Sequence, residues 1–257
     1  MLIKTIAIVG AGTMGSGIAQ VCATSGYTVT LIDVSADALE QARKTIAASV
    51  DKLHSKGKLD DSARQRSSDN ITTRTDLAAA SGADLVIEAA TENKALKFKL
   101  FADLDRLTRP DVILASNTSS ISLTEIAAQT RRPWQVVGIH FMNPVPLIPL
   151  VEVIRGLQTG PTTLESALEF TRSLGKTSVE SADSPGFISN RVLCPMINEA
   201  IFCVMEGIGT PEAIDTVMTL GMNHPMGPLT LADFVGLDVV LDVLDVLYEG
   251  FGDPKYR

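Results

Sequence analysis

The stretch TIAIVGAGTMGSGIAQ, residues 5–20, decides the fold of this chain. It opens with a short β-branched run typical of a buried strand, turns at a glycine-rich loop and continues in a helical pattern. Its glycines have the spacing G-x-G-x-x-G, which permits a tight turn, close backbone approach to a pyrophosphate and close helix–strand packing. The N-terminus of the helix adds N–H groups and positive dipole for phosphate. The loop residues that we predict to bind a dinucleotide are Gly10, Gly12, Thr13, Met14 and Gly15.

Asp33 strengthens the dinucleotide prediction. It follows the next apolar run, residues 27–32, and lies 18 residues after Gly15. A carboxylate at that place binds the ribose 2′-hydroxyl of a dinucleotide. A glycine loop alone also fits an ordinary tight turn between strand and helix, whereas the loop and Asp33 together indicate dinucleotide binding. Because the carboxylate repels a 2′-phosphate, NAD is favoured over NADP.

Strand and helix patterns alternate through the first part of the chain. Apolar runs at residues 84–89 and 112–116 are typical of buried parallel strands. Between such runs lie helical patterns, among them residues 35–57, which Ser35 opens as an N-cap. This alternation predicts an α/β fold with a doubly wound, mainly parallel sheet of the Rossmann type.

The strand patterns stop near residue 180, and the rest of the chain has helical patterns. A long apolar helix is predicted to start at the boundary, with Ser184 as its N-cap and Pro185 in its first turn. Prolines and glycines divide the remainder into short helices. We therefore expect two domains, a dinucleotide-binding domain over residues 1–183 and a smaller all-helical domain over residues 184–257.

The composition is that of an ordinary globular protein, with 45% hydrophobic and 20% charged residues. A net charge of −8 argues against nucleic acid as the main partner. No apolar run is long enough to span a bilayer, and the strand pattern near the start leaves no room for a signal peptide. Three cysteines without paired spacing predict a reducing, cytoplasmic location and no metal site.

Polar side chains follow two of the predicted strands at their carboxyl ends, where ligands bind in open α/β sheets. Glu92 follows one strand, and the segment SNTSS, which contains Asn117 and Ser119, follows the next. Serine and asparagine also cap helices. That explanation is preferred for Ser122, whereas a functional role is favoured for Ser119.

His140 ends another apolar run, in VVGIHFMNPVP, residues 136–146. A buried histidine commonly satisfies a hydrogen bond and has no further role. The prolines that follow, however, turn the chain back into another strand-like run. If that hairpin is centred on Pro146, Glu152 becomes the cross-strand neighbour of His140. A carboxylate there fixes one imidazole nitrogen and leaves the other as a base, a hypothesis that side chains on opposite faces would exclude.

Seven motifs, in order along the whole chain, resemble those of the L-3-hydroxyacyl-CoA dehydrogenases, especially the bacterial short-chain 3-hydroxybutyryl-CoA dehydrogenases. The motifs are IAIVGAGTMGSGIAQ, DLVIEAATEN, SNTSS, HFMNPVPL, VEVI, DSPGFISNR and NHPMGPL. The resemblance implies an NAD-dependent oxidoreductase that interconverts (S)-3-hydroxybutyryl-CoA and acetoacetyl-CoA by hydride transfer. It also implies a homodimer formed through the helical domain. The sequence departs from the family pattern at its end, GDPKYR, because relatives continue with a final helical segment that carries another cofactor-contacting lysine.

The resemblance also implies roles for single residues. His140 is expected to be the general acid/base and Glu152 its partner. Ser119 and Asn190 are expected to contact the substrate at the reacting centre. The residues predicted to bind the cofactor beyond the glycine loop are Asp33, Glu92, Lys97, Asn117, Ser119 and Asn143.

Positive charge for the anionic coenzyme A is predicted after the second strand. Lys52 and Lys56 are four residues apart, hence on one face of a helix, and Lys58 follows. A lysine pair of this kind is commonly a solvated helix face. In relatives, however, lysines here lie over the adenosine part of coenzyme A, so the resemblance implies that Lys52 and Lys56 bind the substrate.

Two other interpretations stay open on the sequence alone. A non-catalytic NAD(H)-binding protein, such as a redox sensor, would share the glycine loop, although no basic winged-helix segment is present to support the sensor. A dehydrogenase of related architecture that acts on a free hydroxy acid or sugar acid would share the fold. The acyl length, the direction of the reaction and the pathway are not determined by the sequence.

Overall fold

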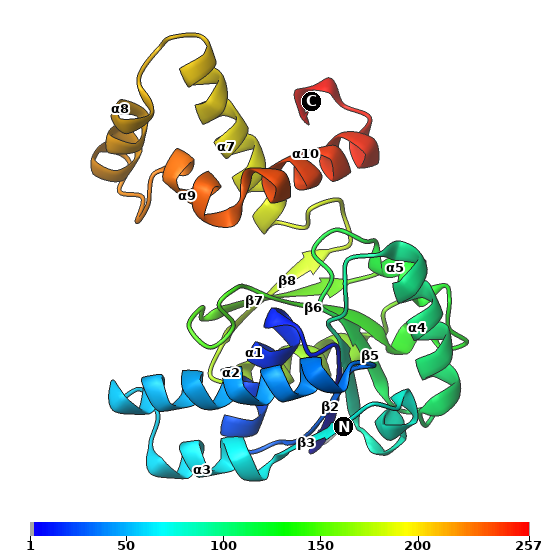
Figure 1. Ribbon diagram of the computed structural model, residues 1–257. Helices are drawn as coiled ribbons and strands as arrows, with labels where there is room; N and C mark the ends of the chain where they lie inside the picture. The colour runs from blue at the N-terminus through cyan, green and yellow to red at the C-terminus, as the bar shows by residue number, and fades with distance from the viewer. Residues whose placement is uncertain (1–2, 257) are drawn as a thin grey trace. The chain divides into compact units, whose positions relative to one another are not determined.

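The computed structural model describes residues 3–256, which form two compact units (Figure 1). The first unit ends at Asp183 and the second begins at Ser184. Each unit has its own cluster of buried apolar side chains. Among residues 3–256, no helix has both the length and the apolar character that crossing a membrane requires.

The first unit is built on an eight-stranded sheet in the order β3-β2-β1-β4-β5-β6-β7-β8. All neighbouring strands are parallel except β6 and β7, which form an antiparallel pair. The predicted Rossmann-type, mainly parallel sheet is therefore confirmed. The strands are β1 (Thr5–Val9), β2 (Thr28–Ile32), β3 (Ile71–Arg74), β4 (Leu85–Glu88), β5 (Ile113–Ser116), β6 (Val136–Phe141), β7 (Leu150–Arg155) and β8 (Thr177–Ala182).

Helices cover both faces of this sheet. The helical elements are α1 (Thr13–Thr24), α2 (Ala36–Ser55), α3 (Asp61–Asp69), η1 (Leu77–Gly82), α4 (Lys94–Leu107), α5 (Leu123–Ala127), η2 (Pro133–Gln135) and α6 (Pro161–Ser173). Side chains of α1, α2 and α6 join alternate strand residues in one buried cluster, while α4 and α5 lie over the other face (Figure 1). The strands alternate their side chains between these two layers, as the two-residue period of a strand requires.

The helix predicted over residues 35–57 is α2, with one change at its end. Ser35 caps it as predicted, because its hydroxyl accepts the N–H of Ala38 at 3.2 Å. The helix ends at Ser55, so Lys56 is its C-cap residue, and Gly57 takes a left-handed conformation with φ +67°. Lys52 therefore lies in the last turn of α2, and Lys56 is the C-cap residue that ends it.

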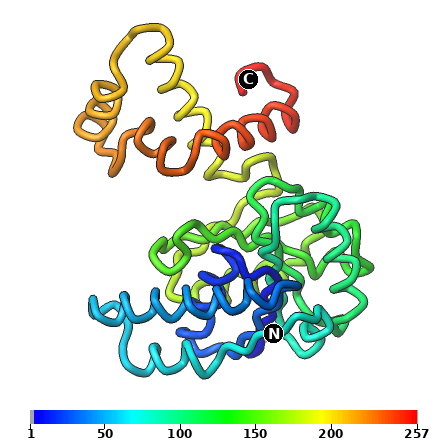
Figure 2. The backbone as a smooth tube through the Cα atoms, in the orientation of Figure 1, coloured from blue at the N-terminus to red at the C-terminus, as the bar shows by residue number. Residues whose placement is uncertain are grey.

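The segment between β2 and β4 contains three elements that the sequence did not reveal, α3, β3 and the short helix η1. The helix α3 has the sequence DSARQRSSD, in which only Ala63 and Ser67 are buried. It therefore lacks the apolar stripe by which an amphipathic helix is identified. Figure 2 shows the chain turning back after α2, so that α3 runs beside it.

The second unit is all-helical, as predicted. Its elements are α7 (Ser189–Met205), α8 (Pro211–Thr216), the π-helical turn η3 (Val217–Gly221), α9 (Pro228–Val235), α10 (Leu237–Phe251) and η4 (Pro254–Tyr256). A small core joins α7 to α10 through side chains such as Ile197 and Leu247. At 15 residues, α10 is longer than the short helices expected for this part of the chain.

The long helix α7 begins at Ser189, later than predicted, and Ser184 does not cap it. Gly186 and Phe187 both have positive φ angles, +72° and +49°, which a right-handed helix excludes. A Cβ on Gly186 would lie 2.8 Å from the side chain of Leu247. Packing against α10 therefore fixes this turn, and the helix starts only after it.

Candidate active site

The three glycines of the loop after β1 are held by different constraints. Gly10 has φ +109°, and a Cβ there would lie 2.5 Å from the carbonyl oxygen of Ala89. A Cβ on Gly15 would overlap the carbonyl oxygen of Gly10 at 1.8 Å. Gly12, in contrast, is exposed, and a Cβ there would meet no atom within 4 Å. The fold therefore requires the first and third glycines, and the space beside Gly12 fits the phosphates of a dinucleotide.

Asp33 lies at the end of β2 and faces this loop. One carboxylate oxygen accepts the N–H of Ala11 at 2.8 Å, and the other accepts the N–H of Ser35 at 2.9 Å. Each oxygen has a second lone pair for a ribose hydroxyl. Of the two other predicted loop contacts, Thr13 is exposed at the start of α1, and Met14 is half-buried against the core. The residues present fit NAD.

Replacing Gly12 by alanine is expected to weaken NADH binding without destabilising the unliganded protein. The added methyl group meets no protein atom within 4 Å, but it occupies the space into which the pyrophosphate must come. Overpacking of this kind costs about 1–3 kcal/mol, or a roughly 5- to 150-fold rise in the NADH Kd. Fluorescence titration with NADH and a urea unfolding curve measure the two effects. Unchanged NADH affinity would contradict the prediction that the pyrophosphate of the cofactor lies beside Gly12.

His140 and Glu152 are paired as the hairpin argument predicted. They are direct partners in the antiparallel β6–β7 ladder, and Nδ1 of His140 lies 2.9 Å from Oε2 of Glu152. Both side chains are buried. Because a carboxylate only accepts, Nδ1 carries the shared proton, and the lone pair of the neutral imidazole is on Nε2. The predicted register is confirmed, and Glu152 fixes the orientation of the His140 imidazole.

The carboxyl ends of β4, β5 and β6 bring further polar groups to the same face of the sheet. Glu88 and Ser116 are register partners at the ends of β4 and β5, and Ser116 donates its hydroxyl to Glu88 at 2.7 Å. The side chain of Asn117 accepts the N–H of Phe141 at 2.9 Å. This bond ties the segment after β5 to the residue that follows His140.

A cluster of charged groups, in which Lys97 and Glu88 are buried and Glu92 is exposed, lies beside the segment after β5. Nζ of Lys97 lies 2.7 Å from Glu88 and 3.3 Å from Glu92, and it also donates to the carbonyl of Ala90. The side chains of Lys97 and Glu88 are 1% and 0% exposed. Three acceptors of the protein thus bind the Lys97 ammonium, and a direct contact between Lys97 and the cofactor stays a prediction.

Glu92 binds the segment that contains Ser119. One of its oxygens accepts the backbone N–H groups of Ser119 and Ser120 at 3.0 and 3.1 Å, together with the hydroxyls of Thr118 and Ser120. Burial alone would raise the pKa of Glu92, but the Lys97 ammonium and these donors lower it below its ordinary value. Glu92 therefore stabilises the fold above the ordinary glutamate pKa, and this contribution is lost as the pH falls through the lowered pKa.

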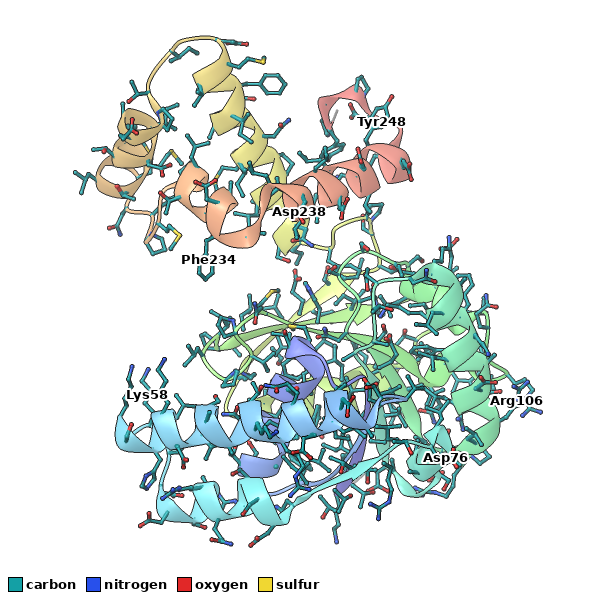
Figure 3. The ribbon with its side chains drawn as sticks, viewed as in Figure 1. Lys58, Asp76, Arg106, Phe234, Asp238 and Tyr248 are labelled. Atoms are coloured by element: carbon teal, nitrogen blue, oxygen red, sulfur yellow. The ribbon has the colours of Figure 1, made fainter. Side chains whose placement is uncertain are left out.

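A cavity of about 440 Å³ lies beside the glycine loop, between α1, α2 and the β6–β7 connection. Asn143 lines it, next to the cis peptide bond between Asn143 and Pro144. Lys52 and Lys56 do not line this cavity and are exposed at the C-terminal end of α2. Figure 3 shows Lys58 at the same end of the helix, with its side chain extending away from the protein.

The remaining predicted site residue, Asn190, belongs to the second unit, near the start of α7, where its backbone N–H donates to Gly186. The two other histidines have different surroundings from His140. His54 lies 2.8 Å from Asp61 at the surface, and His224 donates its N–H to Met218 in a loop of the second unit.

Sequence reasoning missed Glu88 and Ser116, which complete the buried cluster. A signal for Glu88 was present, because a carboxylate ends the otherwise apolar strand LVIE. Ser116 also ends its strand, ILAS. Among residues 3–256, no group of three or more histidine, cysteine or acidic side chains is arranged to hold a metal ion.

Models of two protein families match the chain. The NAD binding domain of 3-hydroxyacyl-CoA dehydrogenase matches residues 5–184, and the C-terminal domain of 3-hydroxyacyl-CoA dehydrogenase matches residues 186–257. The chain belongs to the 3-hydroxyacyl-CoA dehydrogenase family. It is an NAD-dependent dehydrogenase, and its cofactor is NAD. The resemblance found in the sequence motifs is thereby confirmed.

Individual relatives are similar over the whole chain. A probable 3-hydroxybutyryl-CoA dehydrogenase of Bacillus subtilis strain 168 is 53% identical over 257 residues, all of this chain and 90% of the relative. The crystal structure of an (S)-3-hydroxybutyryl-CoA dehydrogenase from Ralstonia eutropha has a TM-score of 0.97 at 49% identity, covering 100% and 90% of the two chains. A 3-hydroxyadipyl-CoA dehydrogenase of Escherichia coli K12 is 43% identical over 98% of this chain and 53% of its own length.

Proposed function

We propose that the protein interconverts (S)-3-hydroxybutyryl-CoA and acetoacetyl-CoA with NAD, and that His140 is the general acid/base. The observation that carries this proposal is the buried His140–Glu152 pair, with Nδ1 held at 2.9 Å by a carboxylate. The names of the relatives from Bacillus subtilis and Ralstonia eutropha support the short-chain substrate. Three free cysteines among the described residues suit a reducing compartment, and we propose the cytoplasm.

His140 removes or returns the proton on the C3 oxygen. Its Nδ1–H donates to Glu152, so Nε2 accepts the hydroxyl proton during oxidation and gives it back during reduction. When bound, NAD supplies the acceptor for the hydride that leaves C3. The buried carboxylate of Glu152 favours the imidazolium that forms, and it holds the ring in one tautomer.

Ser119 and Asn190 orient the substrate in this proposal. The Ser119 backbone is fixed by Glu92, which sets the place from which its hydroxyl donates to the C3 oxygen. Asn190 supplies an amide from the second unit to the thioester region. Groups held in this way raise the rate because the reacting atoms meet in productive geometry.

The deciding experiment follows NADH absorbance with acetoacetyl-CoA and, separately, with free acetoacetate. We expect oxidation of NADH with the thioester and little with the free acid. Activity on the free acid alone would overturn the substrate class, and NADH binding without turnover of either would indicate a non-catalytic protein. Oxidation of 3-hydroxyadipyl-CoA, compared with 3-hydroxybutyryl-CoA, tests the acyl chain, because a relative from Escherichia coli is named for the longer substrate.

We propose that Lys52 and Lys56 bind the phosphates of coenzyme A. Both ammonium groups are exposed, so their contacts with a phosphate are weak and screened by salt. Replacing both by alanine is expected to raise the KM for acetoacetyl-CoA about three- to tenfold at low salt, with kcat and the NADH Kd unchanged. The matched control, Lys4→Ala with Lys99→Ala, removes the same charge from exposed positions elsewhere. Equal KM values for the two double variants would show that Lys52 and Lys56 are solvated surface residues that do not bind coenzyme A.

We propose that two chains form a homodimer through the second unit. Large apolar side chains of this unit are exposed, such as Met205, Leu220 and Phe234 at 69%, 83% and 70%. Figure 3 shows the ring of Phe234 projecting from α9. Exposed apolar surface of this kind indicates an interface. Light scattering should give twice the 27.4 kDa mass of one chain, and the single-chain mass at both low and high concentration would refute the dimer.

A further inference from the structure

The carboxylate of Asp183 binds the first turn of a helix that is distant in sequence and whose N-cap residue is Ser122, as predicted. One oxygen accepts the hydroxyl of Ser122 at 2.7 Å and the N–H of Thr124 at 2.8 Å, while the other accepts the N–H of Leu123 at 3.1 Å. This helix is α5, which begins at Leu123. The N–H groups in the first turn of a helix have no partners within the helix, so these bonds anchor the start of α5.

Asp183 is also fixed to the sheet. It directly follows β8, and its own N–H donates to the carbonyl of Arg155, the last residue of β7, at 3.0 Å. It is the last residue of the first unit. The chain that leaves Asp183 enters the second unit and reaches Asn190 seven residues later. Asp183 thus joins the start of α5 to the chain that leads to Asn190.

The segment between β5 and α5 is therefore held by a carboxylate at each end. Glu92 binds Ser119 and Ser120, and Asp183 binds the residues from Ser122 to Thr124. Ser119 lies three residues before Ser122. In so short a segment, a shift at one end moves the other, because few backbone angles lie between the two anchors.

We propose that Asp183 is a positioning residue of the reaction, which acts through Ser119. Asp183 holds the end of the Ser119 segment that joins α5, whereas Glu92 holds the other end. Asp183 thereby fixes where the Ser119 hydroxyl meets the C3 oxygen. This inference rests on the proposed function, in which Ser119 orients the substrate. Asp183 itself bonds to α5 and is not proposed to touch the reacting atoms.

The first experiment is Asp183→Asn, a change of nearly equal shape. The amide keeps one acceptor oxygen but presents an NH₂ group to donors that the carboxylate accepted. Misplacement of a reacting group by about 1 Å costs up to about 100-fold in rate, so we expect kcat with acetoacetyl-CoA to fall about 10- to 100-fold. The NADH Kd and the KM for acetoacetyl-CoA should each change less than kcat, because the glycine loop and Asp33 lie outside the Ser119 segment.

The matched control is Asp76→Asn. Asp76 caps the helix η1 in the same unit, where it accepts the N–H of Ala78 at 2.9 Å, and Figure 3 labels it on the surface. The same chemical change is made there at a helix unrelated to the Ser119 segment. The control should keep the wild-type kcat, so that loss of a helix cap alone does not explain a defect in Asp183→Asn.

A double-mutant cycle with Ser119→Ala tests the route of the effect. If Asp183 acts through Ser119, the kcat of the double variant should lie within about twofold of the kcat of the slower single variant. Independent effects would multiply instead, and that result would overturn the proposal, as would wild-type kcat in Asp183→Asn. If Asp183→Asn does not fold, Ser122→Ala replaces it in the same cycle. A kcat that falls in Ser122→Ala alone, but does not fall further when Ser122→Ala is added to Ser119→Ala, supports the proposal. An unchanged kcat in Ser122→Ala overturns it.

The failure of the proposed function has a different signature. If Ser119→Ala itself keeps the wild-type kcat, the assignment of Ser119 is wrong, and the role of Asp183 is wrong with it. If Ser119→Ala is slow while Asp183→Asn is normal, or the two effects multiply, only the role of Asp183 is refuted.

Discussion

Replacing His140 by glutamine is expected to lower kcat about 10²- to 10⁴-fold, the usual contribution of a positioned general acid/base. The NADH Kd should be nearly unchanged, because His140 lies outside the glycine loop and Asp33. A glutamine amide can still donate to Glu152, so the buried carboxylate keeps a hydrogen bond and the fold should persist. Steady-state kinetics with acetoacetyl-CoA measure the loss.

The chain offers two matched controls for this variant. His54→Gln removes an imidazole paired with Asp61 at the surface, and His224→Gln removes one from a loop of the second unit. Both should retain the wild-type kcat. If His140→Gln retains half of the wild-type kcat, His140 is not the base and the proposed mechanism is rejected.

Replacing Lys97 by methionine is expected to destabilise the first unit by about 3–5 kcal/mol. The variant leaves the carboxylate of Glu88, which is 0% exposed, with only the neutral donors Ser116 and Ala90. A buried charge without its counter-charge is the costly case, whereas the intact pair is close to neutral in net effect. The chain contains one tryptophan, Trp134, which lies in the first unit, so the urea midpoint of its fluorescence measures the loss.

Two further variants distinguish the cost of a buried, unpaired charge from the cost of losing an ion pair. Lys94→Met breaks the exposed pair of Lys94 with Glu125, whose side chains are 55% and 51% exposed, and should cost less than about 1 kcal/mol. Lys97→Met combined with Glu88→Gln removes both buried charges and should recover part of the stability. If Lys97→Met lowers the free energy of unfolding as little as Lys94→Met does, the stability of the buried cluster does not depend on the charge of Lys97.

The local features of the site were predictable because their causes are local. The glycine spacing follows from the backbone angles and close contacts of one turn, such as those at Gly10 and Gly15. The pairing of His140 with Glu152 follows from the length of a single hairpin, since an antiparallel pair places residues equally distant from the turn opposite one another. Ser35 as a helix cap needs only the three residues that follow it.

Predictions failed where a distant contact overrides the local pattern. The sequence around Pro185 favours a helix start, yet α7 begins only at Ser189, because Gly186 packs against Leu247 in a turn with positive φ. The polar helix α3 carries no apolar stripe, and it forms against neighbours that the sequence does not identify.

The sequence by itself determined the family, the alternation of strands and helices in the first unit, the cofactor and the hairpin that joins His140 to Glu152. The tertiary structure alone decided which polar groups meet: Glu88 with Ser116 through the register of β4 and β5, Lys97 with both Glu88 and Glu92, and Asp183 with the start of α5. Periodicity and turn residues report the conformation of a few neighbouring residues. Partners separated by 28 or 59 residues are brought together only by strand pairing and packing, because a buried polar group must find its partner wherever the fold places one.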